Sequence, residues 1–367
     1  MKRLWNPTKG VSVGWKAQTA VMMKGLGLFL VMLSFVFLAF TASAKDEPIT
    51  ITFSNQNPDS SWSGIHAIAP WAKQVEEATK GKVKVEIYYS QSLSKGKDNW
   101  EATKSGITDM AWCFHGYWPG LTPLADVISL PALPFKTAEQ GSETLWKLYE
   151  KFPEIQKEFA DNKVLLFFTS HPYVLITRDK QVKTMEDLKG MKIRMTGGPP
   201  TDMTLALGAV PSLLPMPEMF LSLQRGIVDG MGAPWEAIHG FRLYEVVKYY
   251  TETPFPAVYF SIAMNQKKWD SLPKDVQDGI LSVSGLQGSK FWGRNHFDTA
   301  KEGVMEKAKA ENRTIELYTL PDAERQRWLD VAGKPIWEQW VKKTTADGHP
   351  VAQKVLDAAI EIMGQLK

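Results

Sequence analysis

Short apolar runs alternate with amphipathic stretches along most of the chain. The apolar runs are rich in β-branched and aromatic residues, as in buried strands, and the stretches between them repeat apolar residues every three or four positions, as in helices. Strands are predicted at residues 49–53, 83–89, 110–114, 164–168 and 173–177, and helices at 65–79, 100–105 and 138–152. Because strands that alternate with helices form sheets covered on both faces, the sequence predicts an α/β fold.

The segment 183–234 is the most informative part of this pattern. Thr184 precedes Glu186 and Asp187, which predicts a capped helical turn whose N-terminal end favours negative charge. Gly190 suits a left-handed cap, and residues 191–195 alternate apolar and charged as a short strand does. A helix follows, with an apolar face made of Met216, Met219, Phe220, Leu223 and Ile227.

Arg194 lies at the end of this predicted strand, facing the helical segment. A guanidinium group in that place can hold an anion through two parallel hydrogen bonds. A salt bridge at the protein surface is the alternative. Arg194 is therefore a candidate anion-binding residue.

Three ordered blocks around Arg194 resemble the solute-binding proteins of TRAP (tripartite ATP-independent periplasmic) transporters. They are segments 187–194 (DLKGMKIR), 207–211 (LGAVP) and 223–230 (LQRGIVDG). The flanking matches, in the family's order, are segments 116–120 (GYWPG) and 130–131 (LP), Asn265, Trp269 and segment 272–273 (LP). The resemblance implies a two-lobed periplasmic binding protein fold, in which two α/β domains enclose a cleft and are joined by crossing hinge strands and a long helix.

The resemblance also implies the lobe boundaries and the function. The N-terminal lobe would contain residues 45–171 plus about 258–297, and the C-terminal lobe residues 172–257 plus about 298–367. Such a receptor captures a small organic anion, a carboxylate or a sulfonate, between its lobes and delivers it to a TRAP membrane permease. Closure of the two lobes around the ligand is part of this expectation.

The resemblance implies a role for one residue, and the sequence differs from the family pattern at two positions. Arg194 falls at the family's arginine that holds the carboxylate of the solute. Val174 stands where sialic acid binders have a second arginine, and Ala233 where an asparagine is common. We therefore expect a small organic acid with an apolar body, or a compact sulfonate.

Aromatic residues at predicted loops and strand ends supply further candidate ligand contacts, because an α/β sheet presents ligands there. Core packing is the alternative for each aromatic residue, and a structural role is the alternative for His171. The complete set of candidate ligand-binding residues is Arg194, Trp112, Phe114, Tyr173, Trp235, Tyr259, Asn55, Trp62 and His171. We expect the loop that follows Phe53 and the segment 112–114 to close on the ligand from the N-terminal lobe.

The first 44 residues have the pattern of a secretory signal peptide. They contain five basic residues, no acidic residue, an apolar run at 26–40 and the small-residue ending Ala42-Ser43-Ala44. Cleavage near Ala44 would give a periplasmic protein, and a retained membrane anchor is the alternative. Removing those five residues from the 43 basic residues leaves 38 against 40 acidic residues, a net charge of −2. We therefore expect no nucleic-acid partner.

Motifs of catalysis give no support to an enzyme. The chain has no P-loop and no dinucleotide-binding glycine pattern, and its six histidines are not spaced as metal ligands. Cys113, the only cysteine, lies in a predicted buried strand and is expected to be a core residue. We expect no cofactor, no metal site, no catalytic residue and a monomeric chain. A secreted enzyme acting on a small organic acid, and a ligand receptor for a sensor kinase, remain the alternative functions.

Overall fold

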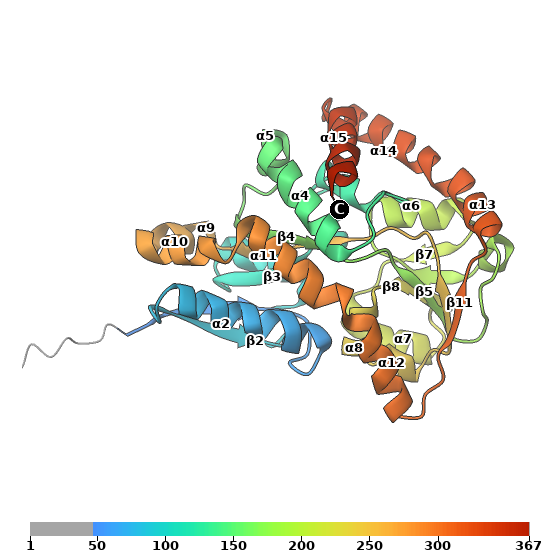
Figure 1. The fold of residues 1–367 in the computed structure, drawn as a ribbon, viewed down its shortest axis with the longest axis horizontal. Coiled ribbons are helices and arrows are strands. Elements are labelled where there is room, and N and C mark those ends of the chain that lie inside the picture. Colours follow the sequence, from blue (N-terminus) through green and yellow to red (C-terminus); the bar gives the residue numbers. More distant parts are fainter. Residues whose placement is uncertain (1–46, 367) are drawn as a thin grey trace, which may run out of the picture. The chain divides into compact units, whose positions relative to one another are not determined.

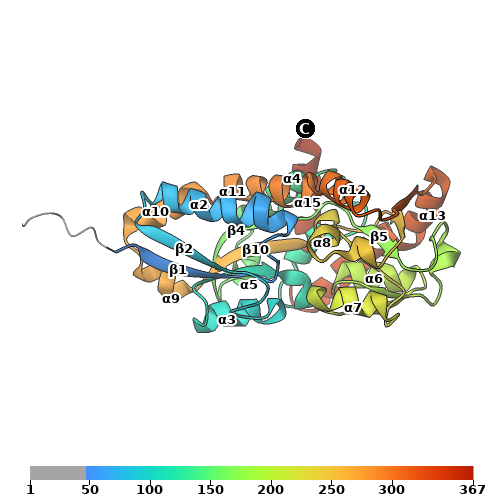
Figure 2. The ribbon, with the colours of Figure 1, turned by 90° about the horizontal axis from the view of Figure 1, so that it is seen from below.

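The computed structural model describes residues 47–366, so the predicted signal peptide lies outside the described residues. Two β-sheets organise this part of the chain, and helices pack against both (Figures 1 and 2). The predicted α/β class is therefore confirmed.

The first sheet has five strands in the order β2-β1-β3-β10-β4. Their bounds are Ile49–Ser54 (β1), Val83–Tyr88 (β2), Met110–Phe114 (β3), Lys163–Thr169 (β4) and Tyr259–Met264 (β10). Strands β1, β2 and β3 run parallel, whereas β10 is antiparallel to both β3 and β4. The sheet is completed by β10, which enters it only after the chain has formed five of the six strands of the second sheet.

Helices cover the first sheet from several parts of the sequence. They are α2 (Ala69–Ala78, preceded by the π-helical turn η1, Gly64–Ile68), α3 (Asn99–Ser105), α4 (Ala138–Lys151), α5 (Pro153–Glu158), α9 (Gln266–Ser271), α10 (Lys274–Ser282) and α11 (Gly285–Trp292). Helices α4 and α11 pack against β4 and each other, α3 packs against β3 and β10, and α2 packs against β2 and α10.

The second sheet has six strands in the order β11-β9-β5-β8-β6-β7. Their bounds are Val174–Thr177 (β5), Lys192–Arg194 (β6), Val210–Ser212 (β7), Gly230–Ala233 (β8), Tyr249–Glu252 (β9) and Glu316–Thr319 (β11). Strand β5 is antiparallel to β8 and β9, and β6 is parallel to β7 and β8. This arrangement brings the ends of β6 and β8, and so Arg194 and the residues after Ala233, to one edge.

The remaining helices lie mainly around the second sheet. They are α6 (Pro199–Ala206), α7 (Met219–Gln224), α8 (Trp235–Gly240), α12 (Ala300–Ala310), α13 (Asp322–Ala332), α14 (Lys334–Ala346) and α15 (Ala352–Gln365). Helix α12 packs against α8, and α14 against α6, whereas α15 packs against α4. The last helix thus contacts the helices of the first sheet, although the boundaries expected from the resemblance assign it to the second lobe.

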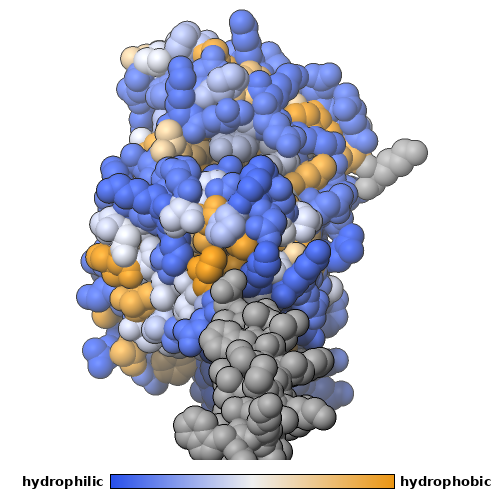
Figure 3. All heavy atoms as spheres, turned by 90° about the vertical axis from the view of Figure 1, so that its left-hand side faces the viewer, coloured by the Kyte–Doolittle hydropathy of each residue, from blue (hydrophilic) through white to orange (hydrophobic). Residues whose placement is uncertain are grey.

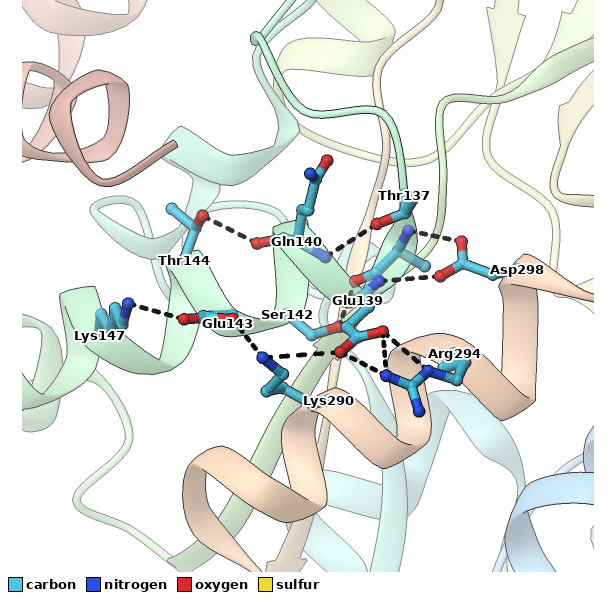
Figure 4. Close-up of polar contacts among 11 residues, drawn as sticks. Thr137, Glu139, Gln140, Ser142, Glu143, Thr144, Lys147, Lys290, Arg294 and Asp298 are labelled. Carbon is cyan, nitrogen blue, oxygen red and sulfur yellow. Dashed lines mark hydrogen bonds and ion pairs between the residues drawn. The ribbon is translucent and has the colours of Figure 1, made fainter. Parts of the chain in front are cut away.

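The chain passes between the sheets by two strand connections, β4 to β5 and β9 to β10, and by the nearly continuous helical run α11, η8 (Gly293–Asp298) and α12. The run is anchored to the N-terminus of α4 by polar contacts (Figure 4). The Asp298 carboxylate accepts hydrogen bonds from the backbone N–H groups of Ala138 and Glu139, at 2.6 and 3.1 Å. Arg294 makes a two-pronged contact with Glu139 at 2.8 Å for each bond, and Lys290 bonds Glu143 at 2.8 Å.

Most predicted elements agree with the structure. The predicted strands from 49–53 to 173–177 match β1 to β5 within one residue at each end. Thr184 and Asp187 form the capping box of a short 3-10 turn, Met185–Leu188, and Gly190 has a left-handed φ of 77°. The predicted apolar helical face holds through Leu223, which is buried in α7, but is wrong at Ile227. Helix α7 ends at Gln224, and Gly226 turns the chain with a φ of 70°, which leaves Ile227 54% exposed.

Buried apolar residues form two clusters, a large one that includes the first sheet and a smaller one around α8 and α12. Cys113 is buried, and burial raises the pKa of its thiol, in agreement with a core role. On the face shown in Figure 3, hydrophilic residues predominate outside the grey atoms and apolar residues form small separate groups. Within residues 47–366, none of the helices combines the length and apolar character that a membrane span requires.

Candidate ligand-binding site

A small cavity lies where the ends of β3, β6 and β8 approach one another. Its volume is about 30 Å³, which is room for about two water molecules. Both sheets and α8 contribute to its wall. The lining residues are Gln56, Asn57, Trp112, Phe114, Tyr173, Arg194, Met216, Pro234, Glu236, Ala237, Phe241 and Phe260.

Arg194 is the cationic residue of this wall. It ends strand β6 and is only 2% exposed. Its Nε donates a hydrogen bond to the Leu214 carbonyl at 3.0 Å, while its buried Nη2 has no hydrogen-bond partner in the described part of the chain. A surface salt bridge, the alternative expected from sequence, is therefore not what this arginine forms. A buried guanidinium with unused donors is unfavourable on its own and is suited to receive an anion.

Two other buried donors of the wall are also unpaired. They are the indole Nε1 of Trp112 and the amide Nδ2 of Asn57. Trp112 packs between Phe114 and Phe260, with ring centroids at 6.3 and 4.9 Å. The cavity thus combines aromatic surface with donors that lack acceptors.

Glu236 supplies the only carboxyl group among the lining residues. It lies in the first turn of α8, and its Oε1 accepts a hydrogen bond from the Ser63 hydroxyl at 2.5 Å. Its Oε2 lies 3.7 Å from Nε2 of His296. Burial raises the pKa of Glu236 to about 7, against the lowering effect of the Ser63 hydrogen bonds. Burial also lowers the pKa of His296 to about 3, so this histidine is neutral at physiological pH.

Hydrogen bonds join the two sides of the cavity. The Tyr117 hydroxyl donates to Gln56 Oε1 at 2.9 Å and accepts from the backbone N–H of Met216 at 2.8 Å. Nearby, the backbone N–H of Gly197 donates to the Gly116 carbonyl at 3.1 Å. Together with the Ser63–Glu236 bond, these contacts hold the segments after the first-sheet strands against the second-sheet side.

Four of the nine predicted site residues lie together in the cavity wall, namely Arg194, Trp112, Phe114 and Tyr173. The other five lie elsewhere. The Asn55 side chain accepts a hydrogen bond from the Asn57 backbone N–H at 2.8 Å. Trp62 packs on His66 with the rings tilted by 31° and a centroid distance of 4.0 Å. The Tyr259 hydroxyl donates to Asp126 Oδ1 at 2.9 Å, away from the cavity. Asn55 and Tyr259 thus make local hydrogen bonds, whereas the buried indole Nε1 of Trp62 has no partner in the described part of the chain.

His171 and Trp235 line a different and larger surface hollow of about 440 Å³, which also contains Lys301. Trp235 stacks on Tyr250 with an interplanar angle of 2°, and the Lys301 ammonium lies 5.4 Å from the centroid of the Trp235 ring. Trp235 is the first residue of α8 and Glu236 is the second. The helix places the carboxyl of Glu236, rather than the indole, in the wall of the cavity.

The sequence reasoning missed several lining residues, above all Asn57, Glu236, Phe241 and Phe260. Phe260 faces the cavity because β10 pairs with β3 in a register that puts Phe260 beside Phe114. No local sequence signal reveals that pairing. Glu236 directly follows the Pro234-Trp235 pair. Its position in the first turn of a helix that follows a strand could have predicted it as a lining residue. In the described part of the chain, no group of three or more His, Cys, Asp or Glu residues could hold a metal ion.

Two α/β sheets joined by crossing segments, with a polar and aromatic cavity where their edges meet, define a two-lobed solute-binding protein. The family model of bacterial extracellular solute-binding proteins, family 7, matches residues 53–344, and the chain belongs to this family.

Solved structures and a curated relative agree with this assignment. A TRAP solute-binding protein from Rhodoferax ferrireducens, crystallised with copurified benzoate, is 28% identical with a TM-score of 0.81, covering 86% of this chain and 98% of that one. A marine metagenome TRAP protein in complex with 3-hydroxybenzoate is 26% identical with a TM-score of 0.81, covering 87% and 99%. The C4-dicarboxylate-binding periplasmic protein DctP of Rhodobacter capsulatus is 25% identical over 322 residues, 84% of this chain and 92% of that protein. The predicted TRAP solute-binding class and two-lobed fold are confirmed.

Proposed function

We propose that this receptor binds an aromatic carboxylate, or an acid with a similarly compact apolar body, and that Arg194 pairs with its carboxylate. The observation that carries this proposal is the buried, unpartnered Nη2 of Arg194 in a cavity walled by Trp112, Phe114 and Phe260. An aromatic ring packs favourably on such side chains, and a carboxylate matches the guanidinium donors. The benzoate and 3-hydroxybenzoate complexes of two structural neighbours support the same ligand class.

Binding requires movement of the cavity wall. A cavity of about 30 Å³ is too small for a benzoate-sized acid, since it has room for only about two water molecules. The hydrogen bonds of Tyr117 to the Met216 backbone and of Ser63 to Glu236 join the two sides of the cavity. We propose that these bonds break when the lobes part and re-form around the ligand, so that the ligand shifts the population toward the closed form.

The proposed physiological role is delivery of the acid to a TRAP permease from the periplasm, after cleavage of the signal peptide near Ala44. Family membership supports the permease partnership, and the composition of residues 1–44 supports export. The lobes would have the boundaries expected from the resemblance, except that α15 packs with α4.

We infer that the ligand leaves the protein chemically unchanged. Ser63, Glu236 and His296 are close together, but Ser63 bonds Glu236 rather than His296, and both ring nitrogens of His296 are unpartnered in the described part of the chain. The Ser–His pair of a serine nucleophile, in which the histidine accepts the serine proton, is therefore not formed here. Proton NMR of benzoate incubated with the protein should show the unaltered compound, whereas new resonances would indicate an enzyme.

Calorimetric titration with benzoate and 3-hydroxybenzoate tests the proposed function directly. The wild-type protein should bind at least one of them, and Arg194→Ala should abolish measurable binding. Arg225→Ala is the matched control, because Arg225 is an exposed arginine of the same region. Absence of binding to the wild-type protein, or equal affinity in Arg194→Ala, would contradict the proposal.

A further inference from the structure

The cavity that contains Arg194 also contains a buried acid. Glu236 is 4% exposed and lines the same wall. Its Oε1 is occupied by the Ser63 hydroxyl at 2.5 Å. The Ser63 backbone also hydrogen-bonds to the carboxyl group, and Oε2 lies 3.7 Å from the neutral His296 ring.

The buried unpaired side-chain atoms of the wall are all donors. Arg194 Nη2, Trp112 Nε1 and Asn57 Nδ2 are each buried and lack an acceptor. A ligand carboxylate satisfies such donors, whereas it would face like charge at Glu236. The group that a ligand places against Glu236 must therefore be a hydrogen-bond donor.

We propose, on the basis of the proposed function, that Glu236 is a specificity-determining residue that selects monocarboxylic acids carrying a hydroxyl group and rejects dicarboxylates. The hydroxyl donates to Glu236 while the carboxylate pairs with Arg194. Rejection follows because a site can discriminate by building a repulsive contact as well as an attractive one. An analogue without the hydroxyl lacks the additional hydrogen bond to the Glu236 carboxylate and should bind less tightly.

Three aromatic acids of matched shape separate these effects. Benzoate has no second group, 3-hydroxybenzoate has a hydroxyl donor, and isophthalate has a second carboxylate in place of that hydroxyl. Titrations at about pH 8 keep the Glu236 carboxyl ionised, because its pKa is about 7. The wild-type protein should bind 3-hydroxybenzoate roughly tenfold or more tightly than isophthalate and also more tightly than benzoate.

Glu236→Gln tests the residue itself. The amide keeps the shape of the side chain but not its charge, so the variant should bind isophthalate more tightly than the wild type does. The ratio of the affinity for 3-hydroxybenzoate to the affinity for isophthalate should therefore decrease. Glu306→Gln removes an exposed carboxylate from the neighbouring helix α12 and should leave the ratio as in the wild type. If Glu236→Gln fails to fold, the wild-type ratio at about pH 6 replaces it, since protonation of Glu236 should narrow the ratio there.

The outcomes distinguish the two proposals. The role of Glu236 would be overturned if the wild-type protein bound isophthalate as tightly as 3-hydroxybenzoate. It would also be overturned if the ratio of these two affinities were unchanged in Glu236→Gln and at about pH 6. The receptor function would stand in both cases. Wild-type protein that binds none of the three acids would contradict the proposed function as well.

Discussion

Polar side chains are paired where the helical run α11–η8–α12 contacts α4 (the anchor), but several are unpaired in the cavity that contains Arg194. At the anchor, the charged side chains are paired: Asp298 caps α4, Glu139 bonds Arg294, and Lys290 bonds Glu143 (Figure 4). In the cavity, the donors of Arg194, Trp112 and Asn57 are buried without acceptors. Since buried polar groups in proteins are nearly always satisfied, three unpaired donors in one wall support the proposed ligand-binding role of the cavity, whereas the anchor pairs connect two segments of the chain.

The comparison implies a difference in energetic consequences. The anchor ion pairs are partly exposed, so each contributes little to folding. Donors without a protein acceptor should lower the stability of the ligand-free protein, and a ligand acceptor should restore that free energy. Substitutions in the cavity should therefore change mainly ligand affinity, whereas substitutions at the anchor should change mainly the free energy of unfolding.

The largest expected effect is the loss of ligand affinity in Arg194→Ala, on the order of 2–5 kcal/mol for truncating one partner of a buried charge pair. Arg194→Lys should lose part of this, because an ammonium group does not reproduce the two parallel bonds. Ligand-free Arg194→Ala should be at least as stable to urea as the wild type, since a buried unpaired charge is removed. Calorimetry and urea unfolding measure both, and a stability loss without an affinity loss would place Arg194 among structural residues.

A pH effect should follow from Glu236. Its pKa is raised by burial from 4.5 to about 7, so the folded protein binds this proton more tightly than the unfolded chain. The resulting stability is fully present below about pH 4.5 and is lost as the pH rises through about 7, by up to about 3 kcal/mol. Ser63 and His296 face the carboxyl group, and neither is charged in this window.

Other buried acids, including Glu158 with a pKa of about 8, act in the same direction. The difference between the wild type and Glu236→Gln isolates the contribution of Glu236. Thermal unfolding of both ligand-free proteins should show that difference changing between about pH 4.5 and 7. If the stability difference between the wild type and Glu236→Gln stayed constant over this range, the pKa of Glu236 would not be raised by burial.

A smaller effect is expected from Trp112→Phe. The substitution keeps an aromatic ring but removes an unpaired donor, so affinity for a carboxylate should fall by about 1–2 kcal/mol. The ligand-induced change in tryptophan fluorescence should also fall in this variant. Trp235→Phe is the control, because Trp235 stacks on Tyr250 outside the cavity. If Trp235→Phe alone removed the signal, the ligand would lie in the larger hollow beside Lys301.

The smallest effect is expected at the anchor. Arg294→Ala breaks the contact with Glu139 and should lower the free energy of unfolding by at most about 1 kcal/mol, as for other exposed pairs. Ligand affinity should remain unchanged. A marked affinity loss would show that the anchor is coupled to the cavity and would weaken the contrast between the two regions.

The sequence predicts local structure better than it predicts the wall of the cavity. Strands β1 to β5, the capping box at Thr184 and the left-handed Gly190 follow from periodicity and from the conformations that these residues prefer. Arg194, which lines the cavity, was predicted as a site residue because it ends a short strand within a block resembling a known family. Phe260 was not found, since its place depends on the pairing of β10 with β3 across most of the chain.

Helix geometry explains a second group of differences. Trp235 and Glu236 are neighbours in sequence, but successive helical residues point in different directions. Of these two residues, Glu236 lines the cavity and Trp235 does not. The sequence pattern favoured Trp235 as a ligand contact because aromatic residues at loops and strand ends are candidate contacts. Tyr259 and Asn55 lie at strand ends as expected, yet their polar atoms are taken by Asp126 and by the Asn57 backbone N–H.

A crystal structure of the protein with bound benzoate tests the central claim most directly. The ligand carboxylate should lie within about 3 Å of the Arg194 guanidinium, with Nη2 as one donor and the ring between Trp112, Phe114 and Phe260. A benzoate bound in the hollow beside Trp235 and Lys301, with Arg194 Nη2 still unpaired, would contradict the account.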